Sequence, residues 1–289
     1  MRNVANFPPA VDTASQPAFA RPDVVGTTMP AATRAPRRQV SERALTIILP
    51  AVTAVVVLAA WQSVATLLAI PAVILPAPSD IVHQLIASWS DFLYQACFTG
   101  GESVLACILS AILGAGLAAM LATSPVLRDM LYANLVAFQV IPKIALAPLF
   151  VVWLGVGAPS RLLFSVFISF FPVVISTLTG LLATEPDAVR LCRSLTATKG
   201  QIFRHVQVPY AVPFCFSGMR VAATLSVIGI IIGEFISSNN GLGSYILLAS
   251  SRADTARVFA ALVVLCGIGL ALYGIIASLE LLLLRTWRG

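Results

Sequence analysis

Three ionisable residues stand inside stretches apolar enough to lie in hydrocarbon: Lys143, Glu234 and Glu102. A charged side chain at the centre of a membrane helix costs roughly 2.5 to 3.5 kcal/mol on insertion scales, so each residue needs a partner or water. For Lys143, two interpretations stay open: it lines the transport pathway and contacts substrate, or it forms an internal pair or snorkels along its stem. Glu234 is a second candidate for lining the pathway, as the partner of Lys143 or as a polar gate residue. Glu102 is expected at the outer interface.

Residues that could perform catalysis or hold a metal show no matching pattern. The sequence has no G-x-S-x-G, no H-E-x-x-H and no G-x-x-x-x-G-K-[ST] phosphate loop, and His83 and His205 are isolated. Its five cysteines form no C-x-x-C pair, and we interpret them as small apolar packing residues. We therefore expect no catalytic, metal-binding or cofactor-binding residues, and we do not expect the chain to be an enzyme.

The elements that must position these residues are those of a membrane protein. Hydrophobic residues make up 58% of the 289 residues and charged residues only 10%, whereas about 25% of the residues in a soluble protein are charged. A bilayer span needs about 20 apolar residues. The expected fold is an all-α integral membrane protein with six transmembrane helices. The sequence predicts these spans at residues 44–70, 97–122, 131–154, 162–183, 214–236 and 258–284.

Basic residues indicate how the spans are oriented. An even number of spans places both termini on one side, and arginines such as Arg43 and Arg285 lie directly before the first span and after the sixth. By the positive-inside rule, both termini are expected to be cytoplasmic. This bias accounts for the net charge of +6, and no nucleic-acid partner is expected. Residues 1–40 are expected to form a disordered cytoplasmic tail, because their composition cannot form a core. Residues 41–289 are expected to form the transmembrane domain.

Three segments between the spans are also patterned. The long loop 184–213 has a helix start at Pro186 and a second helical piece, QIFRHVQVP, that is expected to end at Pro209. Two short helices there would form a compact cytoplasmic knob, although a basic loop that only obeys the positive-inside rule is the alternative. On the outer side, Ser79 is expected to N-cap a short interfacial helix. The sequence GLGS at 241–244 predicts a tight turn before another short helix.

The segment EPDAVRLCRSLTATKGQIFRHVQVPYAVPFCFSGMRVA resembles the EAA loop of binding-protein-dependent ABC importer permeases. The segments LPAPSDIV, VIPKIALAPLFVVWLGVG, SFFPVVISTLTGL and GEFISSNNGLGSYILLASS are similar, in order and spacing, to the branch serving sulfonates, taurine, nitrate and thiamine-pyrimidine or riboflavin precursors. The resemblance implies the type-1 permease fold and a multi-pass protein of the inner membrane. It also implies that the loop couples the permease to an ATPase. The implied coupling residues are Arg190, Arg193, Ser194, Leu195, Thr196, Ala197, Thr198, Lys199, Gly200, Gln201 and Pro209.

The loop departs from the family pattern at several positions. Arg190 stands at the usual Glu, Thr196 at the usual Gly, and Val208 at the usual Leu before Pro209, while Leu191 and Cys192 replace two alanines. A β-branched residue at the glycine position is expected to reshape the turn between the two short helices.

The resemblance also implies the partners of the chain. A permease of this family is fed by an extracytoplasmic substrate-binding protein, is driven by an ATP-binding subunit that holds the ATP, and forms a dimer, here expected to be a homodimer in membrane lipid. The expected function is uptake of a small polar or heteroaromatic solute. A thiamine pyrimidine precursor or a riboflavin-like compound is favoured, and a sulfonate, taurine or nitrate comes next. The alternative is a stand-alone secondary transporter driven by an ion gradient, which would need buried carboxylates near the midplane.

Overall fold

The computed structural model describes the backbone of residues 39–288 and the side-chain surroundings of residues 48–285. The expected tail, residues 1–40, lies almost entirely outside the described residues. The chain divides into two units, residues 1–53 and 54–289, and the second contains every feature considered below.

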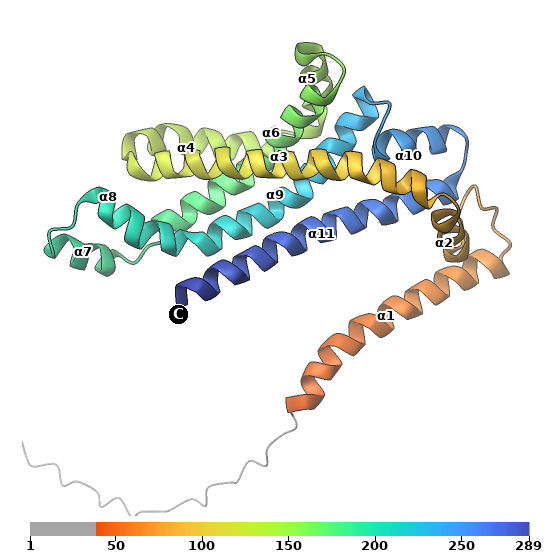
Figure 1. Cartoon of the computed structure of the whole chain (residues 1–289), viewed down its shortest axis with the longest axis horizontal. Coiled ribbons are helices and arrows are strands. Elements are labelled where there is room, and N and C mark those ends of the chain that lie inside the picture. Colours follow the sequence, from red (N-terminus) through yellow and green to blue (C-terminus); the bar gives the residue numbers. More distant parts are fainter. Residues whose placement is uncertain (1–38, 289) are drawn as a thin grey trace, which may run out of the picture. The chain divides into compact units, whose positions relative to one another are not determined.

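All regular elements in the described part are helical, as the composition predicts (Figure 1). In chain order they are α1 (Gln39–Leu67), α2 (Pro78–Ala87), α3 (Trp89–Thr123), α4 (Pro125–Val140), the 3₁₀ turn η1 (Lys143–Leu146), α5 (Ala147–Leu154), α6 (Ala158–Leu182), α7 (Pro186–Ser194), α8 (Lys199–Ile202), the π-helical turn η2 (Phe203–Gln207), α9 (Val208–Ser237), α10 (Leu242–Ser251) and α11 (Thr255–Arg288).

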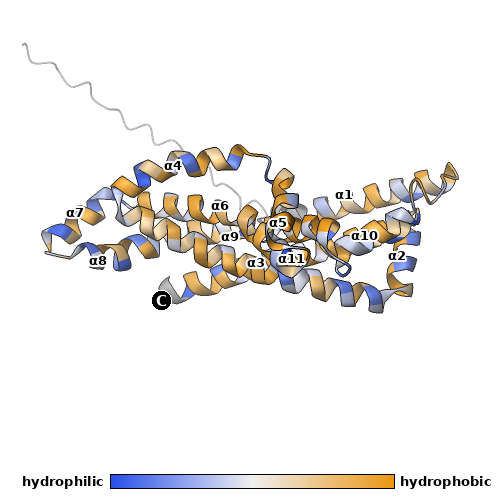
Figure 2. Cartoon of the chain, turned by 90° about the horizontal axis from the view of Figure 1, so that it is seen from above, coloured by the Kyte–Doolittle hydropathy of each residue, from blue (hydrophilic) through white to orange (hydrophobic). Residues whose placement is uncertain are grey.

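The six expected membrane segments are present if one broken segment is included. Within the described residues, five helical stretches are long and apolar enough to cross a membrane: Ile48–Leu67, Trp89–Thr123, Ala158–Leu182, Lys199–Ser237 and Thr255–Arg285. A sixth arises when α4 and the η1–α5 segment, which meet at an angle of 90°, are counted together. Figure 2 shows hydrophobic residues along the long helices and hydrophilic ones gathered on α7 and α8.

The prediction of one continuous third span at 131–154 is wrong. α4 ends at Val140, and Ile141 takes an extended conformation with φ −62° and ψ 132°. A proline disfavours helical geometry in the residue before it and offers no N–H, so Pro142 stops the helix and the chain turns before α5. The ring of Pro148 then fits the first turn of α5, where its missing N–H costs nothing.

Two predicted boundaries also differ from the structure. The helical piece expected to end at Pro209 instead continues through η2 into α9, so the fifth span begins before residue 214. Pro209 lies in the first turn of α9, where proline is tolerated. The short helix expected after the first span is confirmed as α2, but Ala77, not Ser79, is its N-cap. The Asp80 carboxylate accepts a hydrogen bond from the Ala77 amide at 3.1 Å.

The expected packing role of the cysteines holds for only part of the set. All five are free thiols, and Cys107 is buried, whereas Cys97 and Cys266 are exposed on helix surfaces. Sequence alone could not assign these faces, because a long helix that is apolar all round has no unique buried side.

The core is formed where α6 packs along α9 and α3. α6 and α9 approach closely at glycines of α9: a Cβ on Gly229 would lie 2.7 Å from the Ser165 Cα. On Gly218 it would lie 2.9 Å from the Pro172 carbonyl oxygen. Small residues that let backbones approach are typical of helix contacts in membranes, where dispersion contacts and hydrogen bonds replace the hydrophobic effect.

We predict that Gly229→Ala destabilises the protein by about 1 to 3 kcal/mol, because the methyl group meets the α6 backbone. The matched control is Gly116→Ala on α3, where a Cβ would meet no atom within 4 Å. That control is expected to be neutral or stabilising by up to about 1 kcal/mol, since Ala favours helix over Gly. Thermal unfolding midpoints of the purified permease measure both effects, and equal midpoints for the two variants would contradict close α6–α9 packing.

Candidate functional site: the α7–α8 knob and the polar cluster of the spans

The turn between α7 and α8 keeps a glycine-type geometry although it contains threonine. Thr196 has φ +61°, in the left-handed region. The Ala197 amide donates to the Cys192 carbonyl and the Thr196 amide to the Arg193 carbonyl, both at 3.0 Å. These two bonds define a Schellman motif, in which the left-handed residue is usually glycine. Thr196 therefore adopts the conformation that glycine usually takes at this position of the motif, at the cost of strain.

α8 begins immediately after this motif with a capping box. The Gln201 amide donates to the Thr198 Oγ1 at 3.3 Å, and the Thr198 amide donates to the Gln201 Oε1 at 2.8 Å. Because the N-cap Thr198 directly follows Ala197, the last residue of the Schellman motif, no flexible residue lies between the two short helices. The two short helices expected in the loop 184–213 are thus present, whereas their cytoplasmic position stays a prediction. We refer to α7, α8 and this turn as the α7–α8 knob.

Most of the predicted coupling residues lie on the surface of the knob. Leu195 at the end of α7 is 71% exposed, and Leu191 is 62% exposed. Arg190 pairs with Asp187 at 3.3 Å, but both side chains are solvent-exposed, so this pair contributes little to stability. Ala197 and Pro209 are half-buried. Exposed members of the predicted set are Arg190, Arg193, Ser194, Leu195, Thr196, Thr198, Lys199, Gly200 and Gln201.

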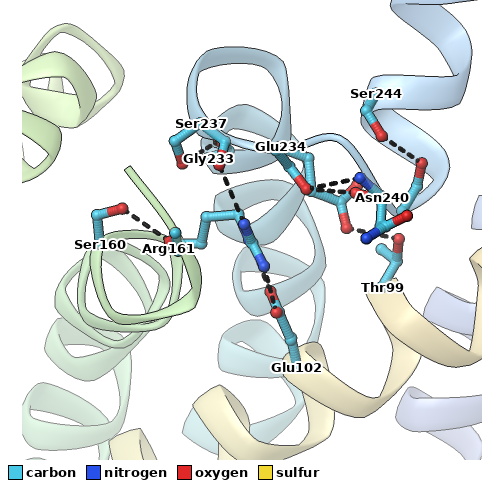
Figure 3. A network of polar contacts seen from close by, with 12 residues as sticks. Thr99, Glu102, Ser160, Arg161, Gly233, Glu234, Ser237, Asn240 and Ser244 are labelled. Atoms are coloured by element: carbon cyan, nitrogen blue, oxygen red, sulfur yellow. Dashed lines mark hydrogen bonds and ion pairs between the residues drawn. The ribbon is translucent and has the colours of Figure 1, made fainter. Parts of the chain in front are cut away.

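A second group of polar residues is buried between α3, α9 and α10 (Figure 3). The Glu234 side chain accepts a hydrogen bond from the Thr99 hydroxyl at 2.7 Å and another from the Gly243 amide at 2.6 Å. Thr99 in turn accepts from the Leu242 amide at 2.8 Å, and Gln95 accepts from the Gly241 amide at 2.6 Å. Side chains of α3 and α9 therefore cap the free amides of the α10 N-terminus, where negative charge is favoured.

The turn before α10 is shaped by this contact. Gly241 has φ +97°, and a Cβ there would lie 2.0 Å from the Glu234 Oε1. Only glycine fits both the backbone conformation and the space, which explains the first glycine of the GLGS sequence in physical terms.

An ion pair joins α6 to the same region. The Arg161 guanidinium donates to both Glu102 carboxylate oxygens, at 3.0 and 2.6 Å, and to the Ser237 carbonyl at 3.1 Å. The Glu102 side chain is only 13% exposed, because Arg161 covers its carboxylate. Its expected position at the outer interface stays a prediction. The predicted spans 131–154 and 162–183 left Arg161 in the segment between them, so this ion pair was not expected from the sequence. A sequence signal for the buried polar face of α3 was available: Thr99 and Glu102 are three residues apart and therefore lie on one face of a helix.

The proposed pair between Lys143 and Glu234 is wrong, because each has other partners. Glu234 is 1% exposed and bonded within the α10 cap. The Lys143 ammonium donates to the Gln139 carbonyl at 3.1 Å and lies 5.5 Å from the centre of the Phe171 ring. Among the described side chains, no group of three or more His, Cys, Asp or Glu residues could hold a metal ion.

The bundle of apolar helices, the broken third span and the projecting knob are features of a multi-span membrane protein (Figure 1). The chain belongs to the family described as the binding-protein-dependent transport system inner membrane component, whose model matches residues 110–284.

Curated relatives agree with this assignment. The chain is 35% identical to a probable ABC transporter permease protein of Haemophilus influenzae, over 75% of this chain and 89% of the relative. It is 34% identical to the formylaminopyrimidine transport permease protein ThiX of Halalkalibacterium halodurans, over 79% and 91%. It is 33% identical to the riboflavin transport system permease protein RibX of Chloroflexus aurantiacus, over 81% and 88%.

A solved structure shows the same fold. The MetNI methionine ABC transporter, in an inward-facing conformation, superposes with a TM-score of 0.53 at 16% identity, over 65% of this chain and 95% of that chain. The protein is therefore a permease subunit of an ABC importer and a multi-pass component of the inner membrane. It is not itself an enzyme, since the ATPase of such transporters is a separate subunit.

We predict that Thr99→Val loosens α10. Valine keeps the volume of threonine but leaves the Leu242 amide and one Glu234 oxygen without their partner, which costs about 1 to 3 kcal/mol. Amide hydrogen exchange of α10 is expected to become faster. The control is Thr179→Val, because the exposed Thr179 hydroxyl bonds only to the Ile175 carbonyl of its own helix. Unchanged exchange of α10 in the Thr99 variant would show that the cap does not hold this helix.

We also predict that Thr196→Gly stabilises the turn of the knob by about 1 kcal/mol, because a left-handed conformation costs a residue with a Cβ about that much. Amide exchange at Ala197 is expected to slow. Thr198→Ala is the opposite control, since losing the N-cap of α8 costs about 1 kcal/mol and speeds exchange. Faster exchange in Thr196→Gly would contradict the strained turn.

Proposed function

We propose that the α7–α8 knob docks on the ATP-binding subunit and transmits its closure to the membrane helices. The observation that carries this proposal is that the knob presents Leu195, which is 71% exposed, and continues through η2 directly into α9. A stiff element that projects from the bundle and runs into a span can carry a displacement, whereas a flexible basic loop cannot.

The proposed orientation places the knob and both termini in the cytoplasm, in agreement with the distribution of Lys and Arg. α10 and α2 then lie on the outer side, below the docking position of the substrate-binding protein. The exposed apolar faces of α1 and α11 fit membrane lipid, and a second copy of the chain completes the pathway as a homodimer.

The solute that we propose is small and polar or heteroaromatic. Two relatives with about one third identity are named for formylaminopyrimidine and riboflavin, which favours a thiamine pyrimidine precursor or a riboflavin-like compound. Sulfonates, taurine and nitrate are the next candidates for the transported solute.

We predict that Leu195→Asp abolishes ATP hydrolysis stimulated by the loaded binding protein, because a carboxylate replaces an apolar contact at the tip of the knob. Loss of such a contact is expected to reduce stimulation at least about tenfold. The matched control is Val126→Asp at the start of α4, where the valine is also 71% exposed. The assay uses the assembled complex in lipid vesicles. Normal stimulation in the Leu195 variant, or a Cys at Thr198 that never crosslinks to the ATP-binding subunit, contradicts the proposal.

A further inference from the structure

Several charged residues in the membrane helices have compensating partners. Arg161 pairs with Glu102, and Arg220 pairs with Glu280. Glu234 accepts hydrogen bonds from a hydroxyl and a backbone amide. Among the described side chains, Lys143 has no carboxylate within ion-pair distance, and its ammonium contacts the Gln139 carbonyl and the Phe171 ring. A carbonyl and a ring face share the charge of an ammonium but do not neutralise it.

The backbone leaves the helix at the same place. α4 ends at Val140, Ile141 is extended, and the 3₁₀ turn η1 starts at Lys143, so carbonyls at the end of α4 lack helical partners. In a bilayer, non-helical backbone occurs only where protein buries it or where it lines a water-filled cavity. Ile144, beside the lysine, is 62% exposed in the single chain. Lys143 itself bonds one of these carbonyls, that of Gln139, and the uncompensated charge together with the remaining open carbonyls favours water at this bend.

We infer that the α4–α5 bend lines the solute pathway and that Lys143 makes it selective by charge, admitting anionic or neutral oxygen-bearing solutes and excluding cations. The inference rests on the proposed function, and it adds a property of the transported solute. In a pathway of low dielectric, one fixed positive charge raises the local concentration of anions and repels cations.

The same bend offers groups that fit a flat, oxygen-bearing solute. The lysine ammonium has three N–H donors and no acceptor, so it bonds to carbonyl, carboxylate, sulfonate or nitrate oxygens. Phe138 is 48% exposed and lies against Phe171, with ring centroids 6.2 Å apart and planes inclined by 22°. An aromatic solute could therefore stack on Phe138 while its oxygens meet Lys143. A solute with a fixed positive charge has no favourable position there.

The test measures access and charge together, without knowledge of the solute. All five cysteines are replaced, Ile144→Cys is introduced, and the transporter is assembled with its ATP-binding subunit and binding protein in vesicles. Reaction rates are compared for an anionic sulfonatoethyl and a cationic trimethylammonioethyl methanethiosulfonate. The ratio of anionic to cationic rates is expected to fall about tenfold with Lys143→Gln and further with Lys143→Glu.

Val126→Cys in the same background is the positional control. It stands at the other end of α4, roughly 21 Å from the end of that helix at 1.5 Å per residue, beyond the screening length of about 8 Å at physiological salt. Its rate ratio should not change with either Lys143 substitution.

Two results overturn the inference: a Cys at position 144 that reacts with neither reagent in the resting, binding-protein-loaded and ATP-bound states, or a rate ratio that is the same with Lys143 and Lys143→Gln. ATP hydrolysis stimulated by the binding protein is measured in the same vesicles. If ATP hydrolysis is stimulated normally but the ratio of reaction rates does not change with Lys143→Gln, the charge selectivity is contradicted and the proposed function is not. If ATP hydrolysis is not stimulated even in the protein that keeps Lys143, the proposed function itself is contradicted.

Discussion

Hydrocarbon offers no hydrogen-bonding partner, so each polar group placed in it must find one within the protein or in enclosed water. The α10 cap shows how this constraint shapes the structure. α10 has only ten residues, which is too few to cross a bilayer. Its N-terminal amides would raise the free energy of the folded protein if they had no hydrogen-bond acceptor. Gln95, Thr99 and Glu234 supply the acceptors from two neighbouring helices. Glycine at 241 leaves the space that the Glu234 carboxylate fills.

The same constraint links the two ends of α9. At one end, η2 joins α9 to the knob without a break, and the stretch Lys199–Ser237 is one candidate span. At the other end, α9 carries Glu234, which holds α10, and the Ser237 carbonyl, which accepts from Arg161. The close approach of α6 to α9 at Gly229 keeps this element in place. A displacement of the knob can therefore be transmitted along the continuous helix of η2 and α9 to the residues that fix α10, which supports the proposed coupling.

The sequence predicted the parts of the fold that depend on composition and on local chemistry. Apolar stretches predicted the long helices, and Pro186 predicted the start of α7. Pro142 directly precedes Lys143, yet the sequence analysis predicts one span there, because hydropathy does not change at the break. The early start of α9 was missed because Pro209 suggests an end of a helix as readily as a first turn.

Pairing between distant residues could not be predicted. Lys143 and Glu234 looked complementary, but Glu234 is bonded 135 residues back along the chain to Thr99, and no single sequence specifies such a contact. Arg161 was assigned to a loop because it lies near the end of its apolar stretch. The left-handed conformation of Thr196 contradicts local preference, and only the two hydrogen bonds of the Schellman motif show it.

The central claim is that a lone positive charge at the broken span faces the transport pathway. Cryo-electron microscopy of the complete transporter in lipid nanodiscs tests it most directly. The account predicts that Lys143 of both permease copies faces a hydrated space, with no carboxylate of either copy within about 4 Å, the limit for an ion pair. Lys143 packed against lipid headgroups, or paired with an acidic residue of the second copy, would contradict the account.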